Sequence, residues 1–159
     1  MRALRTRLAP NLKYTRLTLM EKNVVIWLTD QDLNRLRHLV ADLTRTARGM
    51  QAGVETLEEI LDLGRVVAPN EIPRNIVTMN SQVVFEDLES GEQRAITIVY
   101  PEDAAPLGGK ISVLSPVGIA LLGLSEGAET ELPLPHGRTA RIRIREVAYQ
   151  PEAHGEYSL

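Results

Sequence analysis

The sequence contains no cysteine and no long apolar run, and each absence excludes a class of protein. Without cysteine among its 159 residues, the chain has no disulfide, no thiolate nucleophile and no cysteine ligand for zinc, which suits a reducing compartment. No apolar run approaches the roughly 18 residues needed to cross a bilayer, and no apolar segment follows the basic start as it would in a signal peptide. We therefore expect a cytoplasmic protein that makes no contact with membranes.

Acidic residues outnumber basic residues outside residues 1–22. Residues 1–22 hold six basic side chains and one acid, a net of +5, so the total of −3 leaves −8 for the remainder. An acidic body repels phosphate, and we expect no direct nucleic-acid binding by the folded part. We interpret residues 1–22 as a basic leader that is either disordered or, because Met20 could be the initiator, the product of a misassigned start. A nucleic-acid arm is a third alternative, although the leader lacks interleaved aromatic residues.

Apolar periodicity predicts two helices within residues 23–66. Thr29 has the side chain of an N-cap, and apolar residues recur at a spacing of three and four from residue 33 to residue 47. A second stripe runs from residue 54 to residue 61 and ends at Gly64, a candidate C-cap. We expect these helices to pair antiparallel as a short coiled coil.

Residues 67–75 contain two prolines and little periodicity, which predicts a linker. From residue 76 to residue 159 the apolar period changes to two, which indicates strands. The last strand alternates Ala140, Ile142 and Ile144 toward the core with arginines toward solvent.

A short helix is predicted between these strands. Ser115 supplies an N-cap, Pro116 occupies the first helical position and Gly123 follows the helix. The predicted fold class is therefore α+β: an N-terminal antiparallel helical hairpin and a C-terminal antiparallel sheet with one packed helix.

Four segments of the second part closely resemble the C-terminal domain of the Gre transcript-cleavage factor family, above all the branch called regulator of nucleoside diphosphate kinase. They are residues 75–92 (NIVTMNSQVVFEDLESGE), 99–103 (VYPED), 111–124 (ISVLSPVGIALLGL) and 146–157 (EVAYQPEAHGEY). The resemblance implies an FKBP-like domain that docks at the rim of the secondary channel of RNA polymerase, with the hairpin directed toward the channel. It also implies a monomer.

Within this resemblance, Leu114, Ser115 and Pro116 form the strand-to-helix corner on the docking side of the domain. A helix opened by proline presents a rigid apolar knob, which suits such a contact. The alternative is that Ser115 and Pro116 only cap a core helix. The two roles are compatible.

The hairpin tip departs from the family pattern. Cleavage-stimulating Gre factors carry acidic residues there, which help to hold a magnesium ion at the polymerase active centre. Residues 44–54 of this chain (TRTARGMQAGV) contain no carboxylate, and Arg45 and Arg48 supply the opposite charge. Magnesium requires oxygen ligands, so the tip predicts no metal site, although Asp42 and Glu55 flank it.

We found no enzymatic motif and expect neither catalysis nor a cofactor. The three histidines lie in a helix, a turn and the tail, without a second ligand at metal spacing. The sequence therefore predicts a regulator that binds RNA polymerase and acts by occupying the secondary channel. The alternatives are an active cleavage or anti-arrest factor and, from the FKBP resemblance, a prolyl isomerase or chaperone; few aromatic residues are available for an isomerase pocket.

Overall fold

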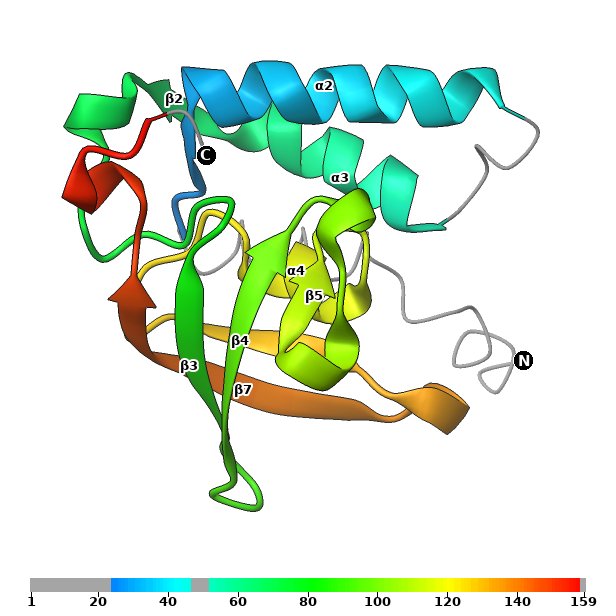
Figure 1. The fold of residues 1–159 in the computed structure, drawn as a ribbon. Coiled ribbons are helices and arrows are strands. Elements are labelled where there is room, and N and C mark those ends of the chain that lie inside the picture. Colours follow the sequence, from blue (N-terminus) through cyan, green and yellow to red (C-terminus); the bar gives the residue numbers. More distant parts are fainter. Residues whose placement is uncertain (1–23, 47–51, 158–159) are drawn as a thin grey trace.

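A computed structural model describes residues 24–46 and 52–157 of the chain. Two long helices lie above a curled sheet (Figure 1). The first, α2 (Asp30–Arg45), and the second, α3 (Ala52–Leu63), contact each other. The α+β class predicted from the sequence is confirmed. No helix in these two ranges is long and apolar enough to cross a membrane.

Local sequence signals determine where the first helix begins. Thr29 has an extended backbone, and its Oγ1 accepts a hydrogen bond from the Asp32 amide at 3.0 Å. This is the N-cap interaction expected from the sequence. Within the apolar stripes of the hairpin, Leu36 and Leu57 are each 0% exposed, whereas Leu39 and Leu43 are partly buried. Ala47, at the end of the first stripe, lies outside the described residues.

Gly64 follows α3 directly, and its amide donates to the Ile60 carbonyl at 3.0 Å. Its backbone is not in the left-handed conformation that usually selects glycine at a helix end. A Cβ atom at this position would lie 2.3 Å from a methyl group of Leu28. A side chain at this position would require the buried Leu28 side chain to move.

A two-stranded parallel pair closes the base of the hairpin. Strand β1 (Trp27–Thr29) precedes α2, and β2 (Arg65–Val67) follows α3. The Arg65 guanidinium lies over the Trp27 ring, 4.6 Å from its centroid. The chain then passes through a short 3-10 helix, Pro69–Glu71, on its way to the large sheet.

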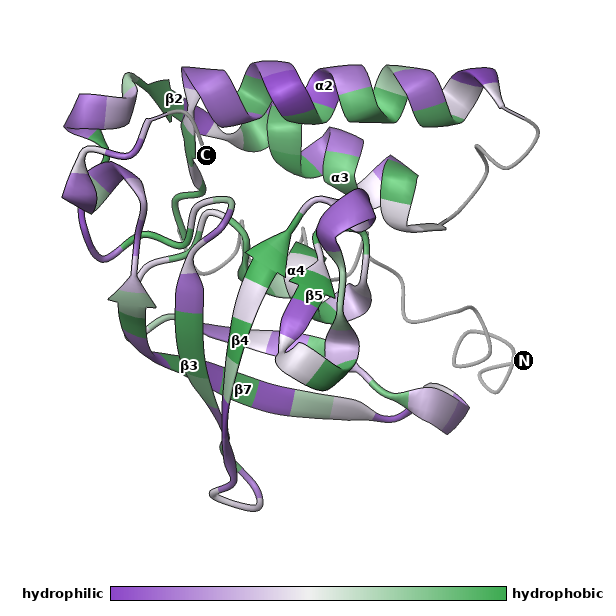
Figure 2. Cartoon of the chain, viewed as in Figure 1, coloured by the Kyte–Doolittle hydropathy of each residue, from purple (hydrophilic) through white to green (hydrophobic). Residues whose placement is uncertain are grey.

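The large sheet has five strands in the order β5-β4-β3-β7-β6. Strand β7 pairs with β3 and β6, and register shifts along β3 mark bulges that curl the sheet. Hydropathy alternates along β7 (Figure 2), with Ala140, Ile142 and Ile144 buried as predicted. The strands are β3 (Gln82–Asp87), β4 (Gln93–Val99), β5 (Lys110–Ser112), β6 (Glu129–Pro133) and β7 (Thr139–Tyr149).

The expectation of a purely antiparallel sheet is wrong at one edge, because β5 pairs with β4 in parallel. Two consecutive strands can be parallel only if the chain crosses back between them. Here two 3-10 turns, Pro101–Asp103 (η3) and Pro106–Gly108 (η4), make that return. The prolines that open these turns do not reveal the strand direction.

The short helix α4 (Pro116–Leu121) lies between the hairpin and the sheet, in contact with α3, β5 and β6. Gly123 follows it with φ +81°, as expected of a glycine after a helix. One cluster of buried apolar residues joins the two parts, including Leu36 and Leu57 from the hairpin, Ile119 from α4 and Ile144 from the sheet. The hairpin and the sheet thus share a core.

Candidate functional site

Hydrogen bonds of two serine side chains stabilise the strand-to-helix corner Leu114–Ser115–Pro116, which is expected to dock. Ser115 Oγ accepts from the Gly118 amide at 3.1 Å and donates to the Ser112 carbonyl at 2.7 Å. Ser112 Oγ accepts from the Leu114 amide at 3.1 Å. Pro116 is exposed at the start of α4, whereas Leu114 is partly buried against the core. We call these three residues the docking corner.

Two glycines set the position of this corner. A Cβ on Gly118 would lie 2.4 Å from the Ser112 carbonyl oxygen, so α4 packs directly on the preceding strand. A Cβ on Gly53 would lie 2.6 Å from the Leu114 carbonyl oxygen, which places the start of α3 against the docking corner. Sequence reasoning missed this contact, because a glycine early in a helix carries no signal of what approaches it.

The hairpin tip is described only in part. Arg45 is the last residue of α2, and its guanidinium forms an ion pair with the Asp42 carboxylate, both groups being largely exposed. Arg48 lies outside the described residues. Glu55 is exposed on α3. Among residues 24–46 and 52–157, no three histidine or acidic side chains are grouped so that they could hold a metal ion.

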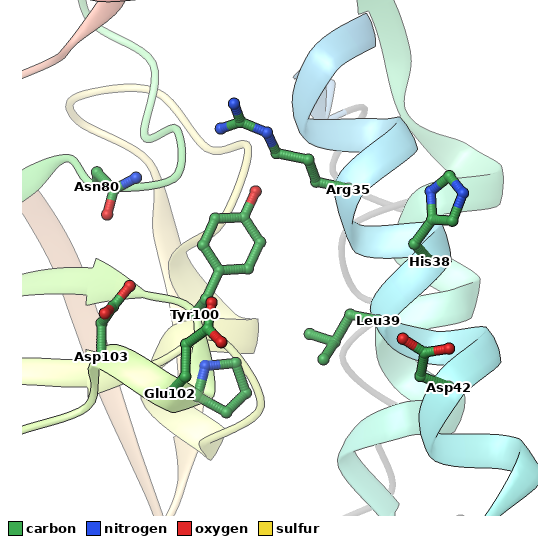
Figure 3. A pocket seen from close by; sticks show the side chains of 9 residues that line it. Arg35, His38, Leu39, Asp42, Asn80, Tyr100, Glu102 and Asp103 are labelled. Atoms are coloured by element: carbon green, nitrogen blue, oxygen red, sulfur yellow. The ribbon is translucent and has the colours of Figure 1, made fainter. Parts of the chain in front are cut away.

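Sequence reasoning did not find a cleft of about 700 Å³ between α2 and the turn after β4. It lies between the two parts of the molecule, and Figure 3 shows the side chains that face it. We call it the hairpin cleft. It is lined by Arg35, His38, Leu39 and Asp42 from α2, and by Asn80, Tyr100, Pro101, Glu102 and Asp103 from the other wall.

A buried carboxylate links α2 to the loop before β3. Asp32 is 5% exposed, and its Oδ2 accepts a hydrogen bond from the Met79 amide at 3.1 Å. Burial raises the pKa of Asp32 to about 7, against the opposing effects of the Met79 amide and the Arg35 charge. Asp32 stands in the first turn of a helix, where an acid usually serves the helix dipole. The sequence therefore gave no reason to expect it in the interior.

Titratable groups beside Asp32 respond to the same environment. Burial raises the pKa of Tyr100, and the Asp32 charge adds to that rise, whereas the Arg35 charge opposes it. Burial also raises the pKa of Glu152, whose carboxylate accepts a hydrogen bond from Thr78 Oγ1 at 2.5 Å. Asp32 comes from α2, Tyr100 from the end of β4 and Glu152 from the tail after β7. The hairpin, the sheet and the C-terminal tail therefore meet at these three groups.

The loop before β3 holds this junction in shape. Thr78 and Ser81 exchange hydrogen bonds, with the Thr78 amide donating to Ser81 Oγ at 3.0 Å. Asn80 between them has φ +64°, a left-handed conformation that asparagine tolerates. The Asn80 amide donates to the Ile98 carbonyl at 2.7 Å. The loop is therefore tied to β4 while Met79 bonds to α2.

A helical hairpin on a curled mixed sheet defines a two-part α+β protein. The family model described as "Transcription elongation factor, GreA/GreB, C-term" matches residues 72–149. This chain belongs to the GreA/GreB family. The resemblance noted from the sequence is confirmed.

Individual relatives support this assignment. The "Regulator of nucleoside diphosphate kinase" of Escherichia coli K12 is 42% identical over 105 residues, covering 66% of this chain and 77% of that protein. "Transcription elongation factor GreA" of Desulfovibrio desulfuricans is 39% identical over 98 residues, which are 61% of this chain and 60% of that protein. The solved GreA/GreB factor from Nitrosomonas europaea is 44% identical with a TM-score of 0.66, covering 79% of this chain and 98% of that one.

Proposed function

We propose that this protein binds RNA polymerase at the rim of its secondary channel and regulates transcription by occupying that channel, without stimulating transcript cleavage. It is not an enzyme in this proposal and needs no cofactor. The observation that carries the proposal is the absence of any carboxylate in residues 44–54, where cleavage-stimulating relatives place acids. In the same proposal the sheet part is an FKBP-like domain and the hairpin a short coiled coil.

The surroundings of the tip favour this proposal over cleavage. Asp42 is the acid nearest the tip on α2, and its carboxylate is already paired with Arg45. Glu55, on the other side, lies on a different helix. An octahedral magnesium ion needs oxygen ligands that converge, and a carboxylate neutralised by a guanidinium is a poor candidate. Helix α2 has 16 residues and spans about 24 Å, which limits how far the tip reaches into a channel.

A transcript-cleavage assay on backtracked elongation complexes tests this mechanism. We expect no RNA shortening with this protein alone, and slower cleavage when it is added together with a cleavage-active GreA, because both would compete for one channel. Excess protein should inhibit and excess GreA should relieve the inhibition. Shortening that depends on this protein and is lost in Asp42→Ala or Glu55→Ala would identify it instead as a cleavage factor.

A further inference from the structure

The first turn of α3 lies directly against the docking corner, with no space for a side chain between them. A Cβ on Gly53 would lie 2.6 Å from the Leu114 carbonyl oxygen and 3.3 Å from Cδ1 of Ile119. Non-bonded heavy atoms in ordinary contact are about 3.5 Å apart, so the shorter distance is a clash. The nearest atom belongs to the backbone and cannot turn aside as the end of a side chain does. A side chain at residue 53 therefore requires either the docking corner or α3 to move.

Hydrogen bonds hold the docking corner to the sheet. The Val113 amide donates to the Val99 carbonyl at 2.8 Å, which joins the residue before the corner to β4. The Leu114 amide donates to Ser112 Oγ at 3.1 Å, and the Ser115 amide donates to the Ser112 carbonyl at 3.0 Å. The backbone is thus fixed on both sides of the Leu114 carbonyl. We therefore expect a side chain at residue 53 to displace the first turn of α3.

The backbone conformation of Gly53 does not explain why a glycine is present. Its φ is not positive, so alanine could adopt the same conformation. Glycine within a helix costs up to about 1 kcal/mol relative to alanine, and this helix has one in its first turn. The close approach of the Leu114 carbonyl is the feature of the structure that only glycine permits.

Two close contacts, one at each end, set the direction of α3. At the base of the hairpin, beside β2, Gly64 lies against Leu28, and at the other end Gly53 lies against Leu114 (Figure 1). Residues 53 and 64 are about 16 Å apart along a helix with a rise of 1.5 Å per residue. A displacement at Gly53 alone therefore tilts α3 about its base and moves the tip side of the hairpin relative to the docking corner.

We propose that Gly53 is a positioning residue that sets the angle between the hairpin and the docking corner, and so directs the hairpin into the secondary channel when the corner docks. This inference rests on the proposed function and deepens it. The docking corner supplies the contact with polymerase, and the contact between Gly53 and Leu114 fixes the hairpin relative to that corner. A substitution at residue 53 changes the angle and leaves the exposed Pro116 in place.

The angle can be measured in the free, full-length protein, because a chain without cysteine accepts spin labels at chosen sites. Thr46→Cys labels the tip side of α2 and Glu89→Cys labels the β3–β4 turn, and both positions are exposed. Double electron–electron resonance measures the distance between the two labels. We expect Gly53→Ala to shift that distance by about 1 Å, the movement that restores ordinary contact at Leu114, and Gly53→Leu to shift it further.

Photo-crosslinking to core polymerase tests whether this angle directs the hairpin. A crosslinker on the single cysteine of Thr46→Cys reports where the tip side of the hairpin lies. We expect Gly53→Leu to reduce crosslinking to the walls of the secondary channel about fivefold, because the reaction requires close and correctly oriented groups. The yield is compared at saturating protein, so a change in affinity alone does not alter it.

Gly108→Leu is the matched control. A Cβ on Gly108 would meet no atom of the described residues within 4 Å, and the φ of Gly108 is not positive. We expect this variant to keep the label distance and the crosslinking of the wild type. Shifts as large as those of Gly53→Leu would show that the contact with Leu114 is not their cause, which would overturn the proposal.

The remaining outcomes separate this inference from the function on which it rests. Wild-type protein that fails to bind polymerase would refute the proposed function itself. Wild-type binding, with label distance and crosslinking unchanged in folded Gly53 variants, would refute only the positioning role and assign Gly53 to core packing. Urea unfolding shows whether each variant is folded. If Gly53→Leu does not fold, the same two measurements on Gly53→Ala decide the question.

Discussion

At the scale of single residues, Asp32 couples the hairpin to the sheet. Its carboxylate is buried at the start of α2 and accepts a hydrogen bond from the Met79 amide in the loop before β3. A buried carboxylate that is only partly compensated favours its neutral form, and Glu152 nearby acts in the same direction. The junction between the two parts therefore contains a group that changes its charge near neutral pH.

Replacing this carboxylate should change how stability depends on pH. Unfolded Asp32 titrates near 3.8 and folded Asp32 near 7, so the folded state holds more protons between these values. The free energy of unfolding should therefore fall as pH rises from about 4 to about 7, and Asp32 accounts for up to about 4 kcal/mol of that fall.

Asp32→Asn stays neutral and keeps an oxygen for the Met79 amide. We expect it to match the wild type at pH 4 and to exceed its stability at pH 8. Urea unfolding at pH 4, 6 and 8 measures the difference. Equal stability of the two proteins at pH 8 would show that burial does not raise the pKa of Asp32.

At the scale of elements, a substitution in the docking corner can test its proposed contact with polymerase without unfolding the domain. Pro116→Asp should reduce polymerase binding at least tenfold, because a charge would be buried against an apolar partner surface. Aspartate is well tolerated in the first turn of a helix and Pro116 is exposed, so the domain should remain folded. Pro135→Asp is the matched control, since Pro135 is also exposed and opens the turn Pro135–Gly137 at the β6–β7 end. Equal binding of both variants and wild type would remove the corner from the interface.

The elements also show which structural features the sequence could predict. Caps and turns depend on residues close in the chain, so Thr29, Ser115 and Gly123 were assigned correctly. The alternation of apolar and polar residues predicted the buried face of β7, because it also depends on residues close in the chain. The parallel direction of β5 depends on how the chain returns through η3 and η4, which periodicity does not encode. The docking role of Leu114, Ser115 and Pro116 comes from the family resemblance and stays a prediction, whereas the hairpin cleft depends on the relative placement of α2 and η3.

At the scale of the whole molecule, the hairpin is part of one core. Leu57 of α3 and Ile119 of α4 belong to the same apolar cluster as Ile144 of the sheet. Strand β1 adds a backbone link, since the Trp27 amide donates to the Gly123 carbonyl at 2.9 Å. A Cβ on Gly123 would lie 2.5 Å from a methyl of Ile26, so this contact leaves no space for a side chain. The hairpin should therefore not unfold independently of the sheet.

Unfolding should accordingly be a single transition. Trp27, the one tryptophan of the chain, lies where hairpin and sheet meet, so its fluorescence reports on that junction, while far-ultraviolet circular dichroism reports on all helices and strands. We expect the two signals to change at the same urea concentration. Leu57→Ala, which removes a fully buried side chain, should lower both midpoints together and cost about 3 kcal/mol. Loss of helical signal before the change in Trp27 fluorescence would instead show that the hairpin is a separate folding unit, held to the sheet by contacts too weak to make the two cooperative.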